Sequence, residues 1–259
     1  MSADGSIAAV SRLPRRMKSH NDPRAALRQD LLYAFHVMDL SGQPSGLGAH
    51  ITARLPGAQT FFFHIHNFGF GEVTPAHIHE SDFELNVLSG AGVDINPTLH
   101  IHTRIYLARP DITCIVHTHA KHVIALSAAG HDFHVVGQNG GRLFEECVTF
   151  DEDDGTALGK EPGEAMARAL GSRSAMMLKN HGLLTAGTTI PEAVLMAITM
   201  DEEAEIQLLA LGATGRLSLP SREGSLRCKQ YVRSELMTQR GWAYFLRKLE
   251  RQRPDVFEM

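Results

Sequence analysis

The sequence predicts an α/β fold, in which helices cover a buried sheet. The run from Ile112 to His119 is apolar at both parities, which is typical of a strand covered on both faces. Asp22 followed by Pro23 is a helix start, and this helix is expected to continue to about Leu40. A second long helix is expected from Ile190, with a proline in its first turn, to Leu211. Long helices around short apolar strands indicate an α/β protein.

The remaining elements are short and follow in order along the chain. After the first helix, a glycine-rich turn at 41–48 leads into strands at 49–54 and 60–65. Asn96-Pro97 predicts a helix start, and Arg109-Pro110 ends that helix. The later elements are a helix start at 120–122, a loop at 137–141, an acidic turn at 151–155, a helix at 161–170, strands at 175–178 and 183–187, and a turn at 179–182 between them. The acidic turn lacks the ligand spacing of a calcium loop, so we interpret it as a solvated turn.

Composition limits the class of protein. We expect one folded domain at 21–259 behind a mobile basic tail at 1–20. A net charge of −4 gives no basic surface for nucleic acid or for an acidic membrane. No apolar run reaches membrane-spanning length. The three cysteines are widely spaced and form no CxxC, which favours a reducing compartment and therefore a cytoplasmic protein.

Two histidines at the end of the buried strand are the strongest sign of chemistry. His117 and His119 are two residues apart on a strand, so both side chains emerge on one face and can bind one cation. Three His-Ile-His triplets occur elsewhere, at 64–66, 77–79 and 100–102. The first two are typical of half-buried strands with isoleucine inward and both imidazoles in water. The third falls on a helix, where residues two apart point about 200° apart and cannot share an ion by themselves.

A third ligand is expected from the turn that contains His181. This turn follows the strand at 175–178, and turns at strand ends are places where a rigid fold projects functional side chains. Three imidazoles with one open position form the catalytic type of zinc site and also suit other borderline divalent ions. We therefore predict one divalent ion, zinc first and manganese or another transition metal as the alternative, bound by His117, His119 and His181.

These motifs resemble a known family. Ala108-Arg109-Pro110-Asp111 ahead of His117-Thr118-His119, and the stretch 179–187, resemble the two signature motifs of the class II aldolase/adducin family. The resemblance extends over about residues 25–250 and includes 50–57, 201–207 and a C-terminal helix. It implies a three-layer α/β/α sandwich with a central, mainly antiparallel sheet. It also implies a divalent metal on the three histidines and a homotetramer with sites near the subunit interfaces.

The chain departs from the sugar-phosphate aldolases of that family at their substrate-binding stretches. Those enzymes carry a glutamate four residues ahead of a histidine, whereas counting back from His102 gives Thr98, which cannot do that proton chemistry. Gly48-Ala49-His50-Ile51-Thr52 stands in place of Gly-Asn-Ile/Val-Ser, and Asn96-Pro97-Thr98 in place of Ser-Ser-Glu. The chain is closer to the adducin-like branch. It retains the metal site without the phosphate-aldolase machinery.

The predicted function is a metal-dependent carbon–carbon lyase for a small, non-phosphorylated, oxygenated substrate. Aldol cleavage and decarboxylation both pass through an enolate that a cation can stabilise, and the sequence does not choose between them. The alternative is a non-catalytic, adducin-like interaction or scaffold protein. No general acid or base is assigned, because a neighbouring chain of a tetramer can supply it.

Five residues are candidates for substrate contact near the metal rather than primary ligands: His50, Thr98, His100, His102 and His122. His102 and Thr98 share a helical face, which points either at the metal or into packing. A set of apolar residues near the C-terminus either caps the core or forms the tetramer interface. This set contains Trp242, Tyr244, Phe245, Leu246 and Leu249.

Overall fold

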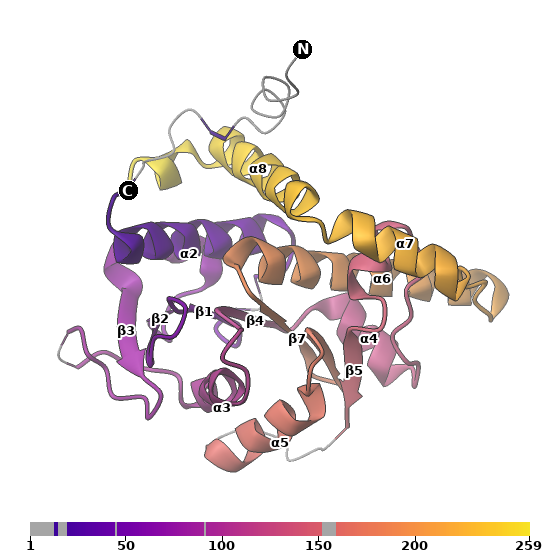
Figure 1. Ribbon diagram of the computed structural model, residues 1–259, viewed down its shortest axis with the longest axis horizontal. Coiled ribbons are helices and arrows are strands. Elements are labelled where there is room, and N and C mark those ends of the chain that lie inside the picture. Colours follow the sequence, from indigo (N-terminus) through magenta and orange to yellow (C-terminus); the bar gives the residue numbers. More distant parts are fainter. Residues whose placement is uncertain (1–12, 15–19, 45, 91, 152–158) are drawn as a thin grey trace.

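Seven strands form one mainly antiparallel sheet in the order β3-β2-β1-β4-β7-β6-β5 (Figure 1). The computed structural model describes residues 13–14, 20–44, 46–90, 92–151 and 159–259, so the predicted tail and the acidic turn lie mostly outside the described residues. The β5–β6 pair is parallel, and the other neighbouring strands are antiparallel. The strands are β1 (His50–Ala53), β2 (Thr60–His64), β3 (Ile78–Asp82), β4 (Cys114–Thr118), β5 (Cys147–Phe150), β6 (Ala175–Leu178) and β7 (Gly182–Gly187).

Helices lie on both faces of this sheet, which confirms the predicted three-layer α/β/α sandwich (Figure 1). One face is covered by α2 (Pro23–Leu40), α4 (Lys121–Ala128), α6 (Ile190–Thr214) and α8 (Glu235–Gln252). The other face is covered by α3 (His100–Ala108) and α5 (Lys160–Leu170). Helix α7 (Arg222–Val232) and five short 3-10 turns complete the described part, at Phe70–Glu72, Pro75–His77, Pro97–Leu99, Asn139–Leu143 and Pro254–Phe257.

Strand β4 runs through the middle of the sheet and contributes to two separate apolar cores. Val116 packs into the core under α2, α6 and α8, whereas Ile115 packs into the core under α3 and α5. Successive side chains of a strand point to opposite faces, so the continuous apolar run at 112–116 serves both cores. The expectation of a strand covered on both faces is confirmed.

The helix boundaries follow their capping residues. The Asp22 side chain accepts a hydrogen bond from the Arg24 backbone N–H, and Pro23 begins α2. Thr189 caps α6 through the Glu192 N–H, and this helix extends to Thr214, three residues beyond the predicted end. Strand β5 and helix α7 have no counterpart in the sequence prediction, whereas β3 corresponds to the half-buried strand expected at 77–79. The two strands lie at the sheet edges and are only partly buried, and α7 buries only Ser225 and Val232.

The first two His-Ile-His triplets behave differently. The prediction is wrong at 64–66, because His64 is 5 % exposed and lies in the core while Ile65 is half-buried. The His64 ring packs between Phe35 and Phe70, with ring centroids 4.6 and 5.6 Å away. At 77–79 the prediction holds better, since Ile78 is buried and both histidines are partly exposed.

The C-terminal helix mainly completes the core. Trp242, Leu246 and Leu249 are buried, whereas Tyr244 is 51 % exposed. All three cysteines are free thiols, so the structure has no disulfide between them. Among the described residues, no helix combines the length and the apolar character that crossing a membrane requires.

Candidate metal centre

The three predicted ligands converge at one end of the sheet. His117 is on β4, His119 follows the end of that strand, and His181 lies in the turn between β6 and β7. One ring nitrogen from each histidine lies within 4.8 Å of the other two. The ring centroids are 4.9–5.2 Å apart, and the Nε2 atoms of His119 and His181 are separated by 3.1 Å. Three imidazoles therefore face one common point.

Backbone geometry holds His181 against the end of β4. Asn180 has a positive φ of 57°, in the left-handed region that asparagine tolerates better than most residues. Gly182 has a φ of 152°, and a Cβ atom there would lie 2.2 Å from the Thr118 carbonyl oxygen. Only glycine allows this close approach of the turn to β4. The Asn180 N–H also donates to the Ser127 hydroxyl at 3.0 Å, which ties the turn to α4.

A second glycine makes room for the ring of His119. A Cβ atom on Gly48 would lie 2.4 Å from His119 Cε1 and 2.9 Å from Nδ1. Any side chain at position 48 would therefore displace this imidazole. Gly48 lies two residues ahead of β1, so the backbone at Gly48 borders the ring of His119.

Burial keeps the three imidazoles neutral at neutral pH. The pKa of His117 lies well below its ordinary value because the ring is buried, and the charges of His50, His181 and His119 lower it further. Burial also lowers the pKa of His119, and burial together with the His119 charge lowers that of His181. Metal binding requires neutral imidazoles, so this environment favours ligation.

The tautomer of His117 is fixed by a carbonyl group. Its Nδ1 lies 2.9 Å from the Leu183 carbonyl oxygen, which can only accept, so Nδ1 carries the proton. The Nε2 lone pair is then available to a cation, and such a hydrogen bond orients the ring. Three neutral nitrogen donors with this orientation fit zinc and other borderline divalent ions.

His50 and His102 form the wall beside this cluster. His50 and Thr52 are two residues apart on β1, and both face α3. The His102 ring lies between them, with its Nε2 atom 2.8 Å from His50 Nδ1 and its Nδ1 atom 2.7 Å from Thr52 Oγ1. The ring of His50 lies 4.7 Å from that of the predicted ligand His117. Thr98 Oγ1 lies 3.1 Å from His50 Nε2, so the side chains of Thr98 and His102 both contact His50.

Two of the five candidates for substrate contact, His100 and His122, contact other parts of the chain. The backbone of His100 contacts α5, because a Cβ atom on Gly163 would lie 2.7 Å from the His100 carbonyl oxygen. His122 is engaged by Asp201, whose carboxylate accepts from both the His122 backbone N–H and Nδ1 at 3.0 Å. The structure therefore joins His50, Thr98 and His102 to the histidine cluster, but gives His100 and His122 other contacts.

The sequence analysis did not identify Gln43, which holds Thr118, the residue between the predicted ligands His117 and His119. The Thr118 hydroxyl donates to Gln43 Oε1 at 2.6 Å, and Gln43 Nε2 donates to the Ala197 carbonyl at 3.1 Å. Gln43 is buried, although it lies in the glycine-rich turn after α2. The available signal was Thr118 itself, since a buried threonine between two ligands points to the opposite face and needs a partner.

Glu203, whose role the sequence analysis did not identify, holds the segment after α4. The Glu203 carboxylate accepts hydrogen bonds from the backbone N–H groups of Val136, Gly137 and Gly140 at 2.8–3.1 Å. A Cβ atom on Gly140 would lie 2.3 Å from this carboxylate. The acidic stretch at 201–207 is therefore a set of backbone anchors: Asp201 fixes the start of α4, and Glu203 fixes the loop beyond that helix.

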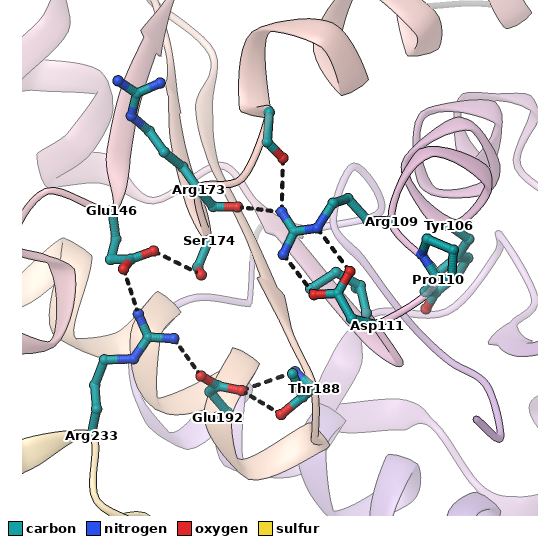
Figure 2. A network of polar contacts seen from close by, with 12 residues as sticks. Tyr106, Arg109, Pro110, Asp111, Glu146, Arg173, Ser174, Thr188, Glu192 and Arg233 are labelled. Carbon is teal, nitrogen blue, oxygen red and sulfur yellow. Dashed lines mark hydrogen bonds and ion pairs between the residues drawn. The ribbon is translucent and has the colours of Figure 1, made fainter. Parts of the chain in front are cut away.

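The motif 108–111 has a structural role at the opposite end of β4 (Figure 2). Arg109 forms a two-pronged ion pair with Asp111 and also donates to the carbonyl oxygens of Gly171 and Arg173. Nearby, Arg233 bridges Glu146 and Glu192, at 3.0 and 2.6 Å. This end of β4 pairs with Gly187, whereas the end that leads to His119 pairs with Leu183. The motif thus fixes the sheet at the end away from the histidines.

The chain belongs to the class II aldolase and adducin family. Residues 29–208, more than half of the chain, match the family model described as "Class II Aldolase and Adducin N-terminal domain". The resemblance stated from the sequence motifs is therefore confirmed.

Three individual proteins illustrate this relationship. The chain is 30% identical over 198 residues to decarboxylase NovR of Streptomyces niveus, covering 75% of this chain and 73% of the relative. It is 30% identical over 197 residues to the 4-hydroxy-3-prenylphenylpyruvate oxygenase/4-hydroxy-3-prenylbenzoate synthase of Streptomyces roseochromogenus, covering 75% and 71%. A crystal structure of an aldolase II superfamily protein from Pseudomonas syringae superposes with a TM-score of 0.81 at 26% identity, covering 91% of this chain and 97% of that one.

Proposed function

We propose that this protein is a divalent-metal-dependent carbon–carbon lyase for a small, oxygenated, non-phosphorylated substrate. The observation that carries the proposal is the convergence of His117, His119 and His181, with one ring nitrogen from each within 4.8 Å of the others. We propose zinc as the ion, with manganese or another transition metal as the alternative. When bound, such an ion acts as a Lewis acid and stabilises the negative charge of an enolate.

The residues around the cluster would orient this chemistry. The Leu183 carbonyl holds the proton of His117 on Nδ1, which would leave the Nε2 lone pair available to an ion. Gly48 leaves space for the ring of His119. His50 borders the cluster, and Thr98, which contacts His50, would supply a contact for the rest of the substrate.

The side chains beside the cluster support decarboxylation better than aldol cleavage. Aldol cleavage needs a base that takes a proton from a hydroxyl group, and Thr98 cannot serve as that base at neutral pH. Loss of carbon dioxide leaves the electron pair on the substrate and needs no base. The relative from Streptomyces niveus is named as a decarboxylase, which supports the same choice. Aldol cleavage stays open if a neighbouring subunit supplies the base.

A non-catalytic role is the second candidate, because the description of the family includes adducin. An interaction domain has no use for three neutral imidazoles gathered beside a wall of buried polar side chains. The three imidazoles therefore support an enzymatic function over a non-catalytic one.

Metal analysis of the purified protein tests the proposal. We expect about one divalent ion per chain, and its loss in His117→Gln, His119→Gln and His181→Gln. His131→Gln is the matched control, because His131 is exposed and lies outside the cluster. The metal-loaded protein is then offered keto acids and hydroxyketones, with release of carbon dioxide or of an aldehyde as the readout. Metal content that His181→Gln leaves unchanged would contradict the assignment.

We also propose that the protein is a homotetramer. Three exposed apolar side chains on α7 and α8 support an interface there: Tyr231, Leu236 and Tyr244. Light scattering at micromolar concentration should give four times the mass of one chain. A monomer mass would refute this part alone.

A further inference from the structure

A continuous chain of six hydrogen-bonding side chains runs from the α3–sheet core to the wall of the candidate metal centre. In order, the members are Tyr106, Thr52, His102, His50, Thr98 and Asn96. Each neighbouring pair lies 2.7–3.1 Å apart between polar atoms. Five members are buried, and Thr98 is the member that is partly exposed. A ligand can therefore meet this chain at Thr98.

The direction of the hydrogen bonds at Thr98 is fixed by Asn96. Asn96 Oδ1 accepts from the Thr98 backbone N–H at 2.9 Å, and a backbone N–H can only donate, so this atom is the amide oxygen. Thr98 Oγ1 lies 2.7 Å from the same oxygen and must donate its proton there. The proton of Thr98 is thus used, and its oxygen must accept from His50 Nε2–H at 3.1 Å.

This result does not depend on the rest of the chain. In one arrangement Tyr106 donates to Thr52, Thr52 to His102, and His102 to His50 Nδ1. The other arrangement, in which the bonds from His50 to Tyr106 run in reverse and end at the Thr113 carbonyl at 3.5 Å, would require a second proton on His50 Nδ1, and the burial of His50 disfavours that charged ring. His50 Nε2–H donates to Thr98 in both arrangements. A hydroxyl oxygen has two lone pairs, so Thr98 keeps one lone pair and no proton for a ligand.

We propose that Thr98 Oγ1 is a hydrogen-bond acceptor for a hydroxyl group of the substrate, and that it thereby selects a neutral hydroxyl over an anionic group beside the metal centre. The inference rests on the proposed function and adds a substrate feature to it. Phosphate and carboxylate oxygens are acceptors and would find no donor at Thr98 or at His50 Nε2, because both protons are already in use. A substrate hydroxyl would find an acceptor held in place by a buried network.

Two ketones that differ by one hydroxyl test this selection on the zinc-loaded protein. Dihydroxyacetone and hydroxyacetone each offer a carbonyl and an adjacent hydroxyl to the ion, but dihydroxyacetone has a second hydroxyl for Thr98. Calorimetry should show dihydroxyacetone binding about 2- to 10-fold more tightly, the range of one net hydrogen bond. Thr98→Val, which has the same shape, should bring the ratio to about 1. Thr98→Ser should keep it. Equal ratios in the wild type and Thr98→Val would overturn the inference.

Two further measurements separate this inference from the proposed function. Thr98→Val leaves His50 Nε2–H without its acceptor, so inorganic phosphate should bind this variant more tightly than the wild type. If neither ketone binds, the proposed function fails for this substrate class, and the phosphate comparison decides the inference: no gain would overturn it. Nitrogen-15 NMR of the metal-free wild type should show His50 Nε2 protonated. An unprotonated Nε2 would overturn the inference whatever the activity.

Discussion

Replacing Thr52 by valine should break the buried chain at its centre without changing the shape of the site. The Thr52 hydroxyl lies 2.7 Å from His102 Nδ1 and 2.8 Å from the Tyr106 hydroxyl, and all three residues are almost fully buried. A buried polar group left without a partner costs about 1–3 kcal/mol. Two groups lose a partner, but Tyr106 keeps its long contact with the Thr113 carbonyl. We therefore expect Thr52→Val to lower the free energy of unfolding by about 2–4 kcal/mol.

Urea unfolding measures this change, and two further variants test its cause. Thr149→Val is the matched control, because Thr149 is an exposed threonine on β5 and should change stability by no more than about 0.5 kcal/mol. Tyr106→Phe removes the second partner, so the double variant should cost less than the sum of the two single variants, by about 1 kcal/mol. A loss below about 1 kcal/mol in Thr52→Val, or strict additivity, would refute the hydrogen-bond chain as a coupled unit.

Three other changes have definite expected outcomes. Gly48→Ala places a Cβ atom 2.4 Å from the ring of His119, so zinc affinity should fall roughly 10- to 100-fold; Gly212→Ala, where no atom lies within 4 Å, should leave zinc affinity unchanged. Glu203→Gln replaces a charged acceptor of three backbone N–H groups and should destabilise the fold by about 2–4 kcal/mol in urea, and a cost under 1 kcal/mol would contradict that role. Burial lowers the pKa of His64 to about 4, so the stability that depends on neutral His64 is complete above pH 6.5 and is lost as the pH falls toward 4. Between pH 7 and 4 the wild type should therefore lose about 3 kcal/mol more than His64→Leu in pH-dependent unfolding, and equal losses would show that His64 does not titrate in this way.

The sequence predicts the interior of this fold better than its edges. Strand β4 and helices α2 and α6 are long or strongly apolar, and their capping residues lie within the sequence window that defines them. The edge strand β5 is partly exposed, so tertiary pairing rather than local pattern decides it, while at the other edge the sequence pattern indicates only the start of β3. His64 was misassigned for a related reason. Its burial depends on Phe35 of α2 and Phe70, which are near it only in the folded chain.

The residues of the candidate site were also predicted only in part from the sequence. The pairing of His117 with His119 follows from strand periodicity, and His181 was expected from its place in a turn at a strand end. The contacts of His50, Thr98 and His102 require the packing of α3 on β1, which sequence spacing alone does not determine. Gln43 and Glu203 were missed because each binds backbone or hydroxyl groups that are distant in sequence.

Strand β1 shows how one short segment can serve both chemistry and stability. His50, Thr52 and Arg54 alternate toward α3, because residues two apart share a face of a strand. Antiparallel pairing places His50 opposite His117, at the end of β4 that leads to the candidate metal centre. Arg54, at the far end, donates to the carbonyl oxygens of Ile112, Tyr106 and Arg109, and so fixes the end of α3 to the start of β4.

The pairing of β1 with β4 determines which substitutions on β1 can affect the candidate site. A substitution at position 50 reaches the candidate metal centre directly, whereas one at position 54 acts through the packing of α3 against the sheet. Thr52 lies between them and hydrogen-bonds to His102 and Tyr106 of α3. A change of substrate preference should therefore follow from positions 50 and 98, while changes at 52 and 54 should first lower stability. Comparing ketone binding with the free energy of unfolding in His50→Gln and Arg54→Lys separates the two effects, and a selective loss of ligand binding in Arg54→Lys would contradict this division of the strand.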